Sequence, residues 1–569
     1  MSRPRRPPLV LAALALALGC GDPGPAASTD DDASSSGSTT GDDGWPGPIS
    51  TVTGATSGAT TTLSGGSGSG EGGDTDEGDP TGPAADEAPT IELLVDGSDA
   101  PVMITRAQTL SVTASVADDR GLVRVELHLD DDPTPLAEVD LTGATAELVE
   151  LPLPILDAET NGSHKLRAVV HDDAMQATES APLGLTLALP KGGSPVWSSV
   201  STSKFASKAL AVAVDSIGDV IAVGSQDTDP NGERSRMMIR KYNGETGEMI
   251  WQREVPTQSE VPTPLGSNVA RGVAVDAYDN VYVVGEVRPD GKSRSLWLGK
   301  YTFDGLQAAS HTSEAPQSRG NAVVATEDRV FVVGYRYDAQ YVNVATVDAY
   351  DAGLKPLWGH LVTIGDTLDA RFYGAALDRN GDLVVAGSST VDQTNVHGLM
   401  GLYTPSGVPL WSKLIASTWP QPHERLFSVV VTDDNEYVGV GRIAAIEDPR
   451  RYWLVRMADD GAQLQSEPEI FLRCGDPQFD DDTDVCGVAQ GPLGRLAMAG
   501  VGLWKSDDFQ IQETKANWWV HLWEPSSDGP DGATDRGLAV ATDADGFVSA
   551  AGYQTGLGAP RWWVMRRNP

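Results

Sequence analysis

Cysteine and basic residues are scarce in this chain. Its 569 residues include 3 cysteines, and Lys and Arg (41 together) are outnumbered by Asp and Glu (80), which leaves a net charge of −39. Nucleic-acid binding needs clustered Lys and Arg to neutralise phosphates, so this composition argues against nucleic acid as a partner. The same deficit argues against electrostatic adsorption to an anionic membrane surface.

Sustained heptads and catalytic signatures are missing as well. The sequence holds no HExxH, GxSxG or Walker A motif. We therefore predict a protein that is not an enzyme and needs no organic cofactor. What the sequence has instead is 62 glycines and short Val-rich segments punctuated by Gly, Asp and Asn. This pattern is typical of β-structure.

The first 20 residues have the pattern of an export signal. Arginines at the start are followed by an apolar run, Leu9–Leu18, of about ten residues, which is too short to span a bilayer as a helix. The run ends in Ala17-Leu18-Gly19-Cys20, which resembles the lipobox of bacterial lipoproteins. The resemblance implies that Cys20 is lipidated and that the protein is anchored in the cell envelope, at the outer membrane or cell surface. The alternative is a plain cleaved signal peptide with an incidental cysteine.

Residues 21–88 offer almost nothing to bury. They consist mainly of Ser, Thr, Gly, Asp and Pro, and no Lys or Arg occurs between Arg6 and Arg106. Such a segment cannot offset its ordering entropy, and its like charges extend it. We expect a disordered acidic linker that serves as a stalk between the lipid anchor and the folded part.

Alternating apolar segments begin at Pro89 and predict a small antiparallel sandwich over residues 89–190. The segments Leu110–Asp131 and His164–Gln176 resemble bacterial immunoglobulin-like (Ig-like) domains in architecture, without the Cys–Trp–Cys pattern of antibody domains. Four aspartates in this region are expected to cap turns through the local backbone, with a calcium cluster as the alternative. They are Asp118, Asp119, Asp172 and Asp173.

Degenerate copies of one unit recur through residues 191–569. Each copy has an apolar run, a tight acidic turn, a second apolar run ending in glycine, an aromatic-rich run and often a run ending in tryptophan. Four strands in about 50 residues predict the blades of a β-propeller. The pattern resembles the seven-bladed propeller repeats of secreted and surface bacterial proteins, which implies a fold but no catalytic residues. The marker glycines are Gly224, Gly285, Gly334, Gly387, Gly441, Gly500 and Gly552.

The last copy ends at Pro569 without a fourth strand. The missing piece occurs at the other end, because Gly193–Trp197 (GSPVW) matches Gly407–Trp411 (GVPLW). We therefore predict that the N-terminal strand completes the last blade and leaves no open edge. The predicted fold is all-β: a seven-bladed propeller preceded by an Ig-like sandwich and a disordered linker.

The long, variable connections of such a propeller, between second and third strands and between blades, emerge on one face, where binding sites usually lie. A basic residue begins most first strands at this face. Converging guanidinium groups would suit a carboxylate or phosphate. The alternative is that each pairs with an acid of its own loop, such as Asp369 or Asp535, and braces neighbouring blades. The candidates are Lys208, Arg271, Arg319, Arg371, Arg425 and Arg536.

Cys474 and Cys486 lie in one loop of the repeat region. In an exported protein such a pair is expected to form a disulfide. The acids between them carry the oxygen ligands that calcium prefers, but they lack EF-hand spacing. We expect solvated loop acids, with calcium binding as the alternative. The acids are Asp480, Asp481, Asp482 and Asp484.

These observations predict a non-catalytic, monomeric lipoprotein that displays a propeller on a stalk. It would bind a protein or glycan at the long-loop face and touch the membrane through its lipid anchor only. One alternative is a propeller-type enzyme, a polysaccharide lyase or hydrolase, that acts on an extracellular polymer. The other is a scaffold lipoprotein of envelope assembly, which would rest on analogy of fold alone.

Overall fold

The computed structural model describes most of the chain from residue 86 onward. Cys20, Cys474, Cys486 and Asp480–Asp484 lie outside the described residues, as do the signal segment and nearly all of the linker. In the described part, no helix has the length and hydropathy of a membrane span. The described ranges are 86–155, 161–232, 234–255, 268–288, 293–362, 368–392, 395–417, 423–445, 448–469, 472–473, 487–499, 501–502, 509–513, 518–522, 534–555 and 559–569.

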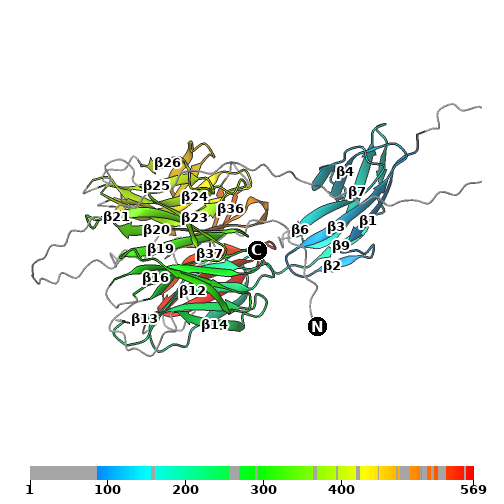
Figure 1. The fold of residues 1–569 in the computed structure, drawn as a ribbon. Coiled ribbons are helices and arrows are strands. Elements are labelled where there is room, and N and C mark those ends of the chain that lie inside the picture. Colours follow the sequence, from blue (N-terminus) through cyan, green and yellow to red (C-terminus); the bar gives the residue numbers. More distant parts are fainter. Residues whose placement is uncertain are drawn as a thin grey trace, which may run out of the picture. The chain divides into compact units, whose positions relative to one another are not determined.

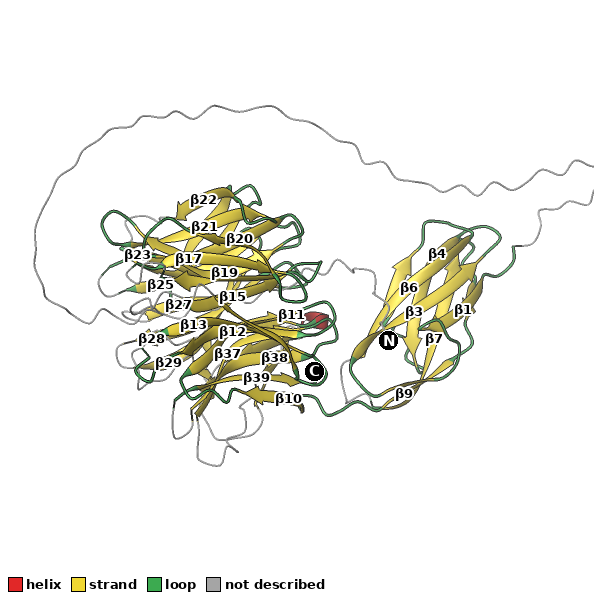
Figure 2. Ribbon diagram, turned by 60° about the horizontal axis from the view of Figure 1, so that its bottom comes forward, coloured by secondary structure: helices red, strands yellow, loops and turns green. Residues whose placement is uncertain are grey.

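The described residues form an all-β protein, as predicted, with many antiparallel sheets (Figure 2). A short 3-10 turn, Pro492–Gly494, interrupts the strands. The sheets fall into two groups that share no strand, called here the N-terminal domain (β1 to β9) and the repeat region (β10 to β39).

The N-terminal domain consists of two sheets around one core (Figure 1). Side chains of the third strand alternate between the core, where Leu110, Val112 and Ala114 are buried, and solvent, to which Ser111 and Ser115 are exposed. This alternation is typical of a sheet with one buried face. One sheet has the order β1 (Thr90–Val95), β3 (Gln108–Ala117), β6 (Ala146–Ile155); the other has the order β2 (Val102–Ile104), β9 (Leu183–Leu187), β7 (Gly162–Asp172), β4 (Leu122–Leu129), β5 (Ala137–Asp140), with β8 (Ala177–Glu179) beside β7.

Two of the four aspartates named for this domain cap turns. The Asp118 carboxylate accepts hydrogen bonds from the backbone N–H groups of Arg120 and Gly121, and the Asp172 carboxylate accepts from those of Ala174 and Gln176. The predicted capping role is therefore confirmed for Asp118 and Asp172. Among the described residues, no group of three His, Cys, Asp or Glu side chains is placed to hold a metal ion.

The repeat region is a series of four-stranded units, each named here after its first strand. One parallel bridge, between Val396 and His423, joins the β23 and β27 units into a single sheet. Inner strands such as β16 are buried along their whole length, whereas outer strands such as β22 are mostly exposed. The strands are β11 (Ser207–Val214), β12 (Val220–Asp227), β13 (Ser235–Tyr242) and β14 (Met249–Val255); β15 (Val269–Val275), β16 (Val281–Val287), β17 (Ser295–Tyr301) and β18 (Gln307–Thr312); β19 (Ser318–Ala325), β20 (Arg329–Tyr337), β21 (Asn343–Asp351) and β22 (Pro356–Val362); β23 (Asp369–Leu377), β24 (Leu383–Thr390), β25 (Val396–Tyr403) and β26 (Pro409–Ile415); β27 (His423–Val431), β28 (Tyr437–Ala445), β29 (Asp448–Met457) and β30 (Gln463–Glu469).

The unit that begins at β32 differs from the others. Its third strand, β36, lies beside β33 as predicted, but in parallel orientation, and β35, which precedes β36 in the chain, forms the outer edge. The outer strand therefore comes from the insertion after β33 and not from the segment after β36. The strands are β32 (Gly487–Gln490), β33 (Leu496–Ala499), β35 (Phe509–Glu513) and β36 (Trp518–Leu522), with a separate pair of β31 (Leu472–Arg473) and β34 (Val501–Gly502).

The marker glycines lie where two strands approach unusually closely. Each described marker glycine pairs with a first-strand residue at the edge of a β-bulge, such as Gly285 with Ala270. A Cβ on Gly285 would overlap the carbonyl oxygen of Val269, and equivalent overlaps occur at Gly224, Gly334, Gly387 and Gly441. The repeated glycine is therefore required by backbone packing at the bulge.

Tryptophans at the third position of outer strands, and not at their ends as the sequence predicts, connect neighbouring units. The indole N–H of Trp251 donates to the carbonyl of Phe303 in the next unit (3.1 Å), and its ring occupies the space where Gly305 would carry a Cβ. A side chain at Gly305 is excluded twice, because this residue also has a φ of +80°. The same arrangement joins Trp197 with Gly244 and Gly247, Trp358 with Pro405 and Gly407, and Trp411 with Asp459 and Gly461.

The first and last parts of the repeat region are joined. Strand β10 (Pro195–Val200) pairs with β39 (Arg561–Arg567) and completes the sheet β10-β39-β38-β37, which also contains β38 (Val548–Thr555) and β37 (Thr534–Thr542). The predicted role of the segment around Trp197 as the missing fourth strand is confirmed. First strands contact each other in the order β11, β15, β19, β23, β27, β32 and β37, and β37 contacts β11.

Candidate functional site

The strand register places the predicted basic residues at two different positions. Lys208, Arg319, Arg371, Arg425 and Arg536 each pair with the residue that follows a marker glycine. In the β15 unit this position is held by a valine, and the arginine that was expected there lies two residues later, at the bulge between Ala270 and Gly272. Arg271 is therefore not an equivalent of the others.

Arg271 nevertheless contacts the arginine of the next unit through a shared carboxylate. Glu286, on β16, accepts hydrogen bonds from Arg271 Nη2 (2.9 Å) and from Arg319 Nε (2.9 Å) and Nη2 (3.2 Å). Arg294 Nε lies 3.9 Å from the same carboxylate. Burial by itself would raise the pKa of Glu286, but the guanidinium groups of Arg319, Arg271 and Arg294 hold it well below its usual range.

A second arginine–carboxylate pair lies one unit further along the chain. Arg371 forms two parallel hydrogen bonds to Asp369, from Nε to Oδ1 and from Nη2 to Oδ2, each 2.9 Å long. The ring of Tyr335 lies between two guanidinium groups, with Arg319 5.3 Å and Arg371 5.0 Å from its centroid. The pairing of Arg371 with Asp369 is the one expected if these residues brace neighbouring units.

The remaining predicted residues of this set lie elsewhere. Lys208 is half-buried, with its ammonium 4.9 Å from the centroid of the Tyr553 ring. Arg425 is half-buried and pairs in register with Arg442. The side chain of Arg536 lies outside the described residues. Arg271 and Arg319 are buried, and together with Arg371 they make short contacts to carboxylates; a small molecule reaches this cluster only by displacing those contacts.

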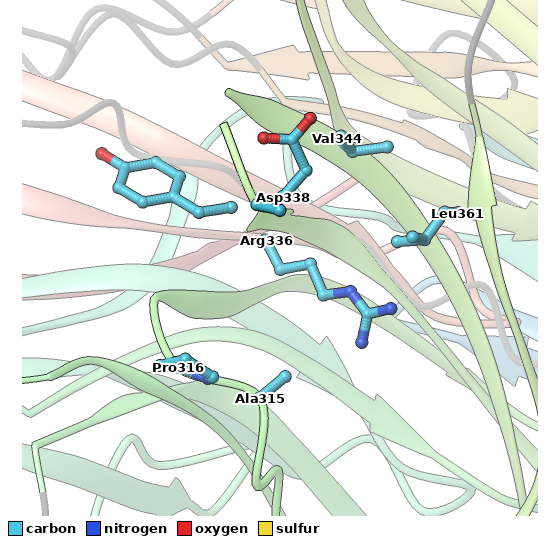
Figure 3. A pocket seen from close by; sticks show the side chains of 8 residues that line it. Ala315, Pro316, Arg336, Asp338, Val344 and Leu361 are labelled. Carbon is cyan, nitrogen blue, oxygen red and sulfur yellow. The ribbon is translucent and has the colours of Figure 1, made fainter. Parts of the chain in front are cut away.

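An open cavity lies on the same face of the repeat region, between the β15 and β19 units (Figure 3). Its volume is about 340 Å³, and its lining comes from the connection between β18 and β19, from the end of β20 and the turn after it, and from β21 and β22. The lining residues are Ala315, Pro316, Arg336, Tyr337, Asp338, Ala339, Val344 and Leu361. The cavity lies on the long-loop face that the sequence predicts for a site, but none of its lining residues is among the predicted ones, although a Tyr-Asp pair in such a turn is a usable signal.

The polar side chains of the cavity differ in how strongly they are held. The Asp338 carboxylate accepts hydrogen bonds from the backbone N–H groups of Gln340 (2.8 Å) and Val342 (2.9 Å), so it shapes the turn. Figure 3 shows the Arg336 guanidinium on the side of Ala315 and the Asp338 carboxylate pointing the other way. Tyr337 is 36% exposed, which leaves its ring accessible at the rim.

A half-buried carboxyl group lies on the sheet face that continues from the cavity. Asp348 is opposite Gly359 in the register, and a Cβ on this glycine would overlap Asp348 Oδ1. Burial raises the pKa of Asp348 to about 6, although the nearby Arg336 guanidinium lowers it. Tyr350, two residues along the same face, has its pKa raised by burial and by Asp348.

Replacing Asp348 with asparagine is expected to stabilise the protein at neutral pH. The folded-state pKa is above the unfolded value near 3.8, so the folded state binds more protons between these values and loses stability as the pH rises through this window. At pH 7.5 the variant should unfold with a free energy about 1 to 2 kcal/mol higher than the parent protein. Urea unfolding at pH 4, 6 and 7.5 measures the difference in the free energy of unfolding between the variant and the parent protein. If this difference does not shrink toward pH 4, the prediction is wrong.

No family model matches the chain, and no curated protein matches it either. Its fold is similar to that of a Dyadobacter fermentans protein of unknown function, at 13% identity and a TM-score of 0.39, over 66% of this chain and 99% of that one. It is also similar to the Hadza microbial sialidase Hz136 (8% identity, TM-score 0.35, 82% and 98% covered). A third similar structure is rhamnogalacturonan lyase YesW (13% identity, TM-score 0.33, 82% and 90% covered).

Proposed function

We propose that residues 191–569 are a seven-bladed β-propeller, that residues 89–190 are an Ig-like spacer, and that a lipid on Cys20 anchors both to the cell envelope. The propeller is supported by the cyclic order of contacts from β11 to β37 and back to β11. The pairing of β10 with β39 and the contact of Trp197 with Gly244 support closure of the ring. Lipid anchoring rests on the sequence pattern before Cys20.

We infer that the propeller binds a glycan at the cavity between the β15 and β19 units and does not act as an enzyme. The observation that carries this proposal is a concave site of about 340 Å³ with an accessible Tyr337 ring and charged groups on an otherwise apolar wall. This size suits a sugar unit. Sugars present apolar C–H faces to aromatic rings and hydroxyl groups to polar side chains.

A large protein partner is less well matched to this site. A stable protein–protein interface buries about 1,200 to 2,000 Å² of combined surface, whereas the cavity is a small hollow. A second exposed ring lies beside Tyr337. Tyr341 is 81% exposed, and the centroids of the two rings are 6.5 Å apart in an edge-to-face arrangement. Two accessible tyrosines beside a hollow give a sugar chain more than one stacking position.

A glycan array probed with the full chain carrying Cys20→Ser tests the proposal. The hits would then be measured by calorimetry with Tyr337→Ala, which should weaken binding about tenfold or more. Tyr278→Ala is the matched control, since Tyr278 is 65% exposed in the β15–β16 turn at the other end of the strands. It should leave affinity unchanged.

Three outcomes would contradict the proposal. One is an array without any bound glycan. Another is an equal effect of Tyr337→Ala and Tyr278→Ala, which would place binding away from the cavity. The third is shortening of a bound polymer during incubation, which would favour the lyase or hydrolase alternative.

A further inference from the structure

Arg336 is an arginine at the wall of the cavity that is not committed to another side chain. Its side chain is half-buried, and in the described part of the chain it forms no hydrogen bond or ion pair within 4.0 Å. This separates it from Arg271, Arg319 and Arg371, whose guanidinium groups bind carboxylates directly. A guanidinium group presents a planar set of donors that matches a carboxylate. A guanidinium group beside a cavity that binds no other side chain can therefore bind an anion.

The same sheet face carries a negative group near this arginine. Arg336 is directly opposite Val344 in the register, and every second residue of β21 after Val344 lies on that face, including Thr346 and Asp348. Burial raises the pKa of the Asp348 carboxyl group, and Arg336 lowers it by a smaller amount. Asp348 is opposite Val332, four residues along β21 from Val344, so it acts on Arg336 as a counter-charge at a distance and not through a close ion pair.

Two other titratable groups are considered with Asp348, one on its own strand, β21, and one on β18. Tyr350 follows on β21, and the His311 ring of β18 lies 5.1 Å from the Tyr350 ring. Burial holds the pKa of His311 below its usual value, with Glu314 acting in the opposite direction. Asp338, which lines the cavity two residues after Arg336, is held in the turn by its backbone hydrogen bonds. Asp348 is the acid whose pKa responds to Arg336.

We propose that Arg336 binds the carboxylate of an acidic sugar in the cavity and that Asp348 competes with it, so that the sugar binds more tightly when Asp348 is protonated. The inference rests on the proposed glycan-binding function and adds the ligand class and its pH dependence. A ligand carboxylate and an ionised Asp348 near one guanidinium group repel each other. Protonation of Asp348 removes this repulsion while the sugar carboxylate stays ionised.

The expected size of the effect follows from the charges. Affinity for an acidic sugar should rise about three- to tenfold as the pH falls from 7.5 to 5, because protonation of Asp348 removes one negative charge from a partly solvated site. Affinity for the matched neutral sugar should not change. Asp348→Asn should bind the acidic sugar at pH 7.5 as tightly as the parent protein does at pH 5.

The experiment uses calorimetric titration of the full chain carrying Cys20→Ser with glucuronate, galacturonate and their neutral counterparts, glucose and galactose, at pH 5, 6 and 7.5. Arg336→Gln should reduce binding of the acidic sugars to the level of the neutral ones. Inorganic phosphate serves as an anion without a ring and should bind at least about tenfold more weakly than the acidic sugars, since it cannot stack on an aromatic ring.

Each result decides a stated point. Equal binding of acidic and neutral sugars, or an unchanged Arg336→Gln, overturns this inference while leaving glycan binding in place. Absence of binding by every sugar overturns both proposals. A pH dependence that persists in Asp348→Asn overturns the role of Asp348 and assigns it to His311. Phosphate binding as tight as that of the acidic sugars overturns the assignment to a sugar acid.

Discussion

Replacing Gly285 with alanine is expected to lower the free energy of unfolding by about 3 kcal/mol or more. The new Cβ would overlap the carbonyl oxygen of Val269 and lie 2.9 Å from the Cα of Ala270. Both are backbone atoms of the bulged first strand, so no side-chain rotation relieves the contact. The strands must separate at the bulge, which breaks pairing between β15 and β16. Urea unfolding followed by tryptophan fluorescence measures the loss.

Gly491→Ala is the control for this prediction. Gly491 has an ordinary extended backbone (φ −99°, ψ −179°), and the nearest atom to its added Cβ is Thr542 Cγ2 at 3.6 Å. The change should cost less than about 1 kcal/mol. If both variants lost the same stability, the close approach at the bulge would not be the reason that glycine recurs in the repeats.

Glu286→Gln is expected to destabilise the protein by about 3 kcal/mol at neutral pH. The change keeps the size of the side chain but removes the charge that the buried guanidinium groups of Arg271 and Arg319 share. The amide would also direct N–H groups at N–H donors. In the folded state the pKa of Glu286 lies below its usual range. The carboxylate therefore stabilises the protein above about pH 4.5, and this stabilisation is lost as the pH falls below that value.

The pH dependence distinguishes Glu286 from Asp348, because the two pKa values are displaced in opposite directions. The stability difference between the parent protein and Glu286→Gln should narrow only in strongly acidic solution. Arg294→Gln is the control, because its guanidinium lies 3.9 Å from Glu286 and is 21% exposed, and it should cost less than about 1 kcal/mol. Equal losses in Glu286→Gln and Arg294→Gln would refute a central role of the carboxylate.

Repetition made much of the fold predictable. Val-rich runs, acidic turns and glycines at regular spacing specify strands and turns locally, and the match between Gly193–Trp197 and Gly407–Trp411 predicted a long-range pair. The structure confirms this pair, in which β10 lies beside β39. The prediction succeeded because each unit repeats the same packing problem, so a copy that lacks one strand identifies its missing partner.

The register of individual side chains could not be predicted in the same way. The first strands of the β11, β15, β19 and β23 units have a bulge at the same place, and Arg271 is the bulged residue itself, whereas Lys208, Arg319 and Arg371 lie two residues before it. Local sequence carries no mark of the bulge, since its residue varies between units. Glu286 could not be predicted as a site residue because it lies within an apolar strand and meets Arg319 only when two units pack together.

The amino-acid sequence by itself determined the all-β architecture, the repeat and the strand that joins its two ends. Tertiary structure alone decided which charges meet and where a hollow remains. Arg271 and Arg319 come from different units and share Glu286, and the cavity beside Arg336 lies between two units. Contacts between units depend on the shapes of both neighbours, whereas strand periodicity is set within each one.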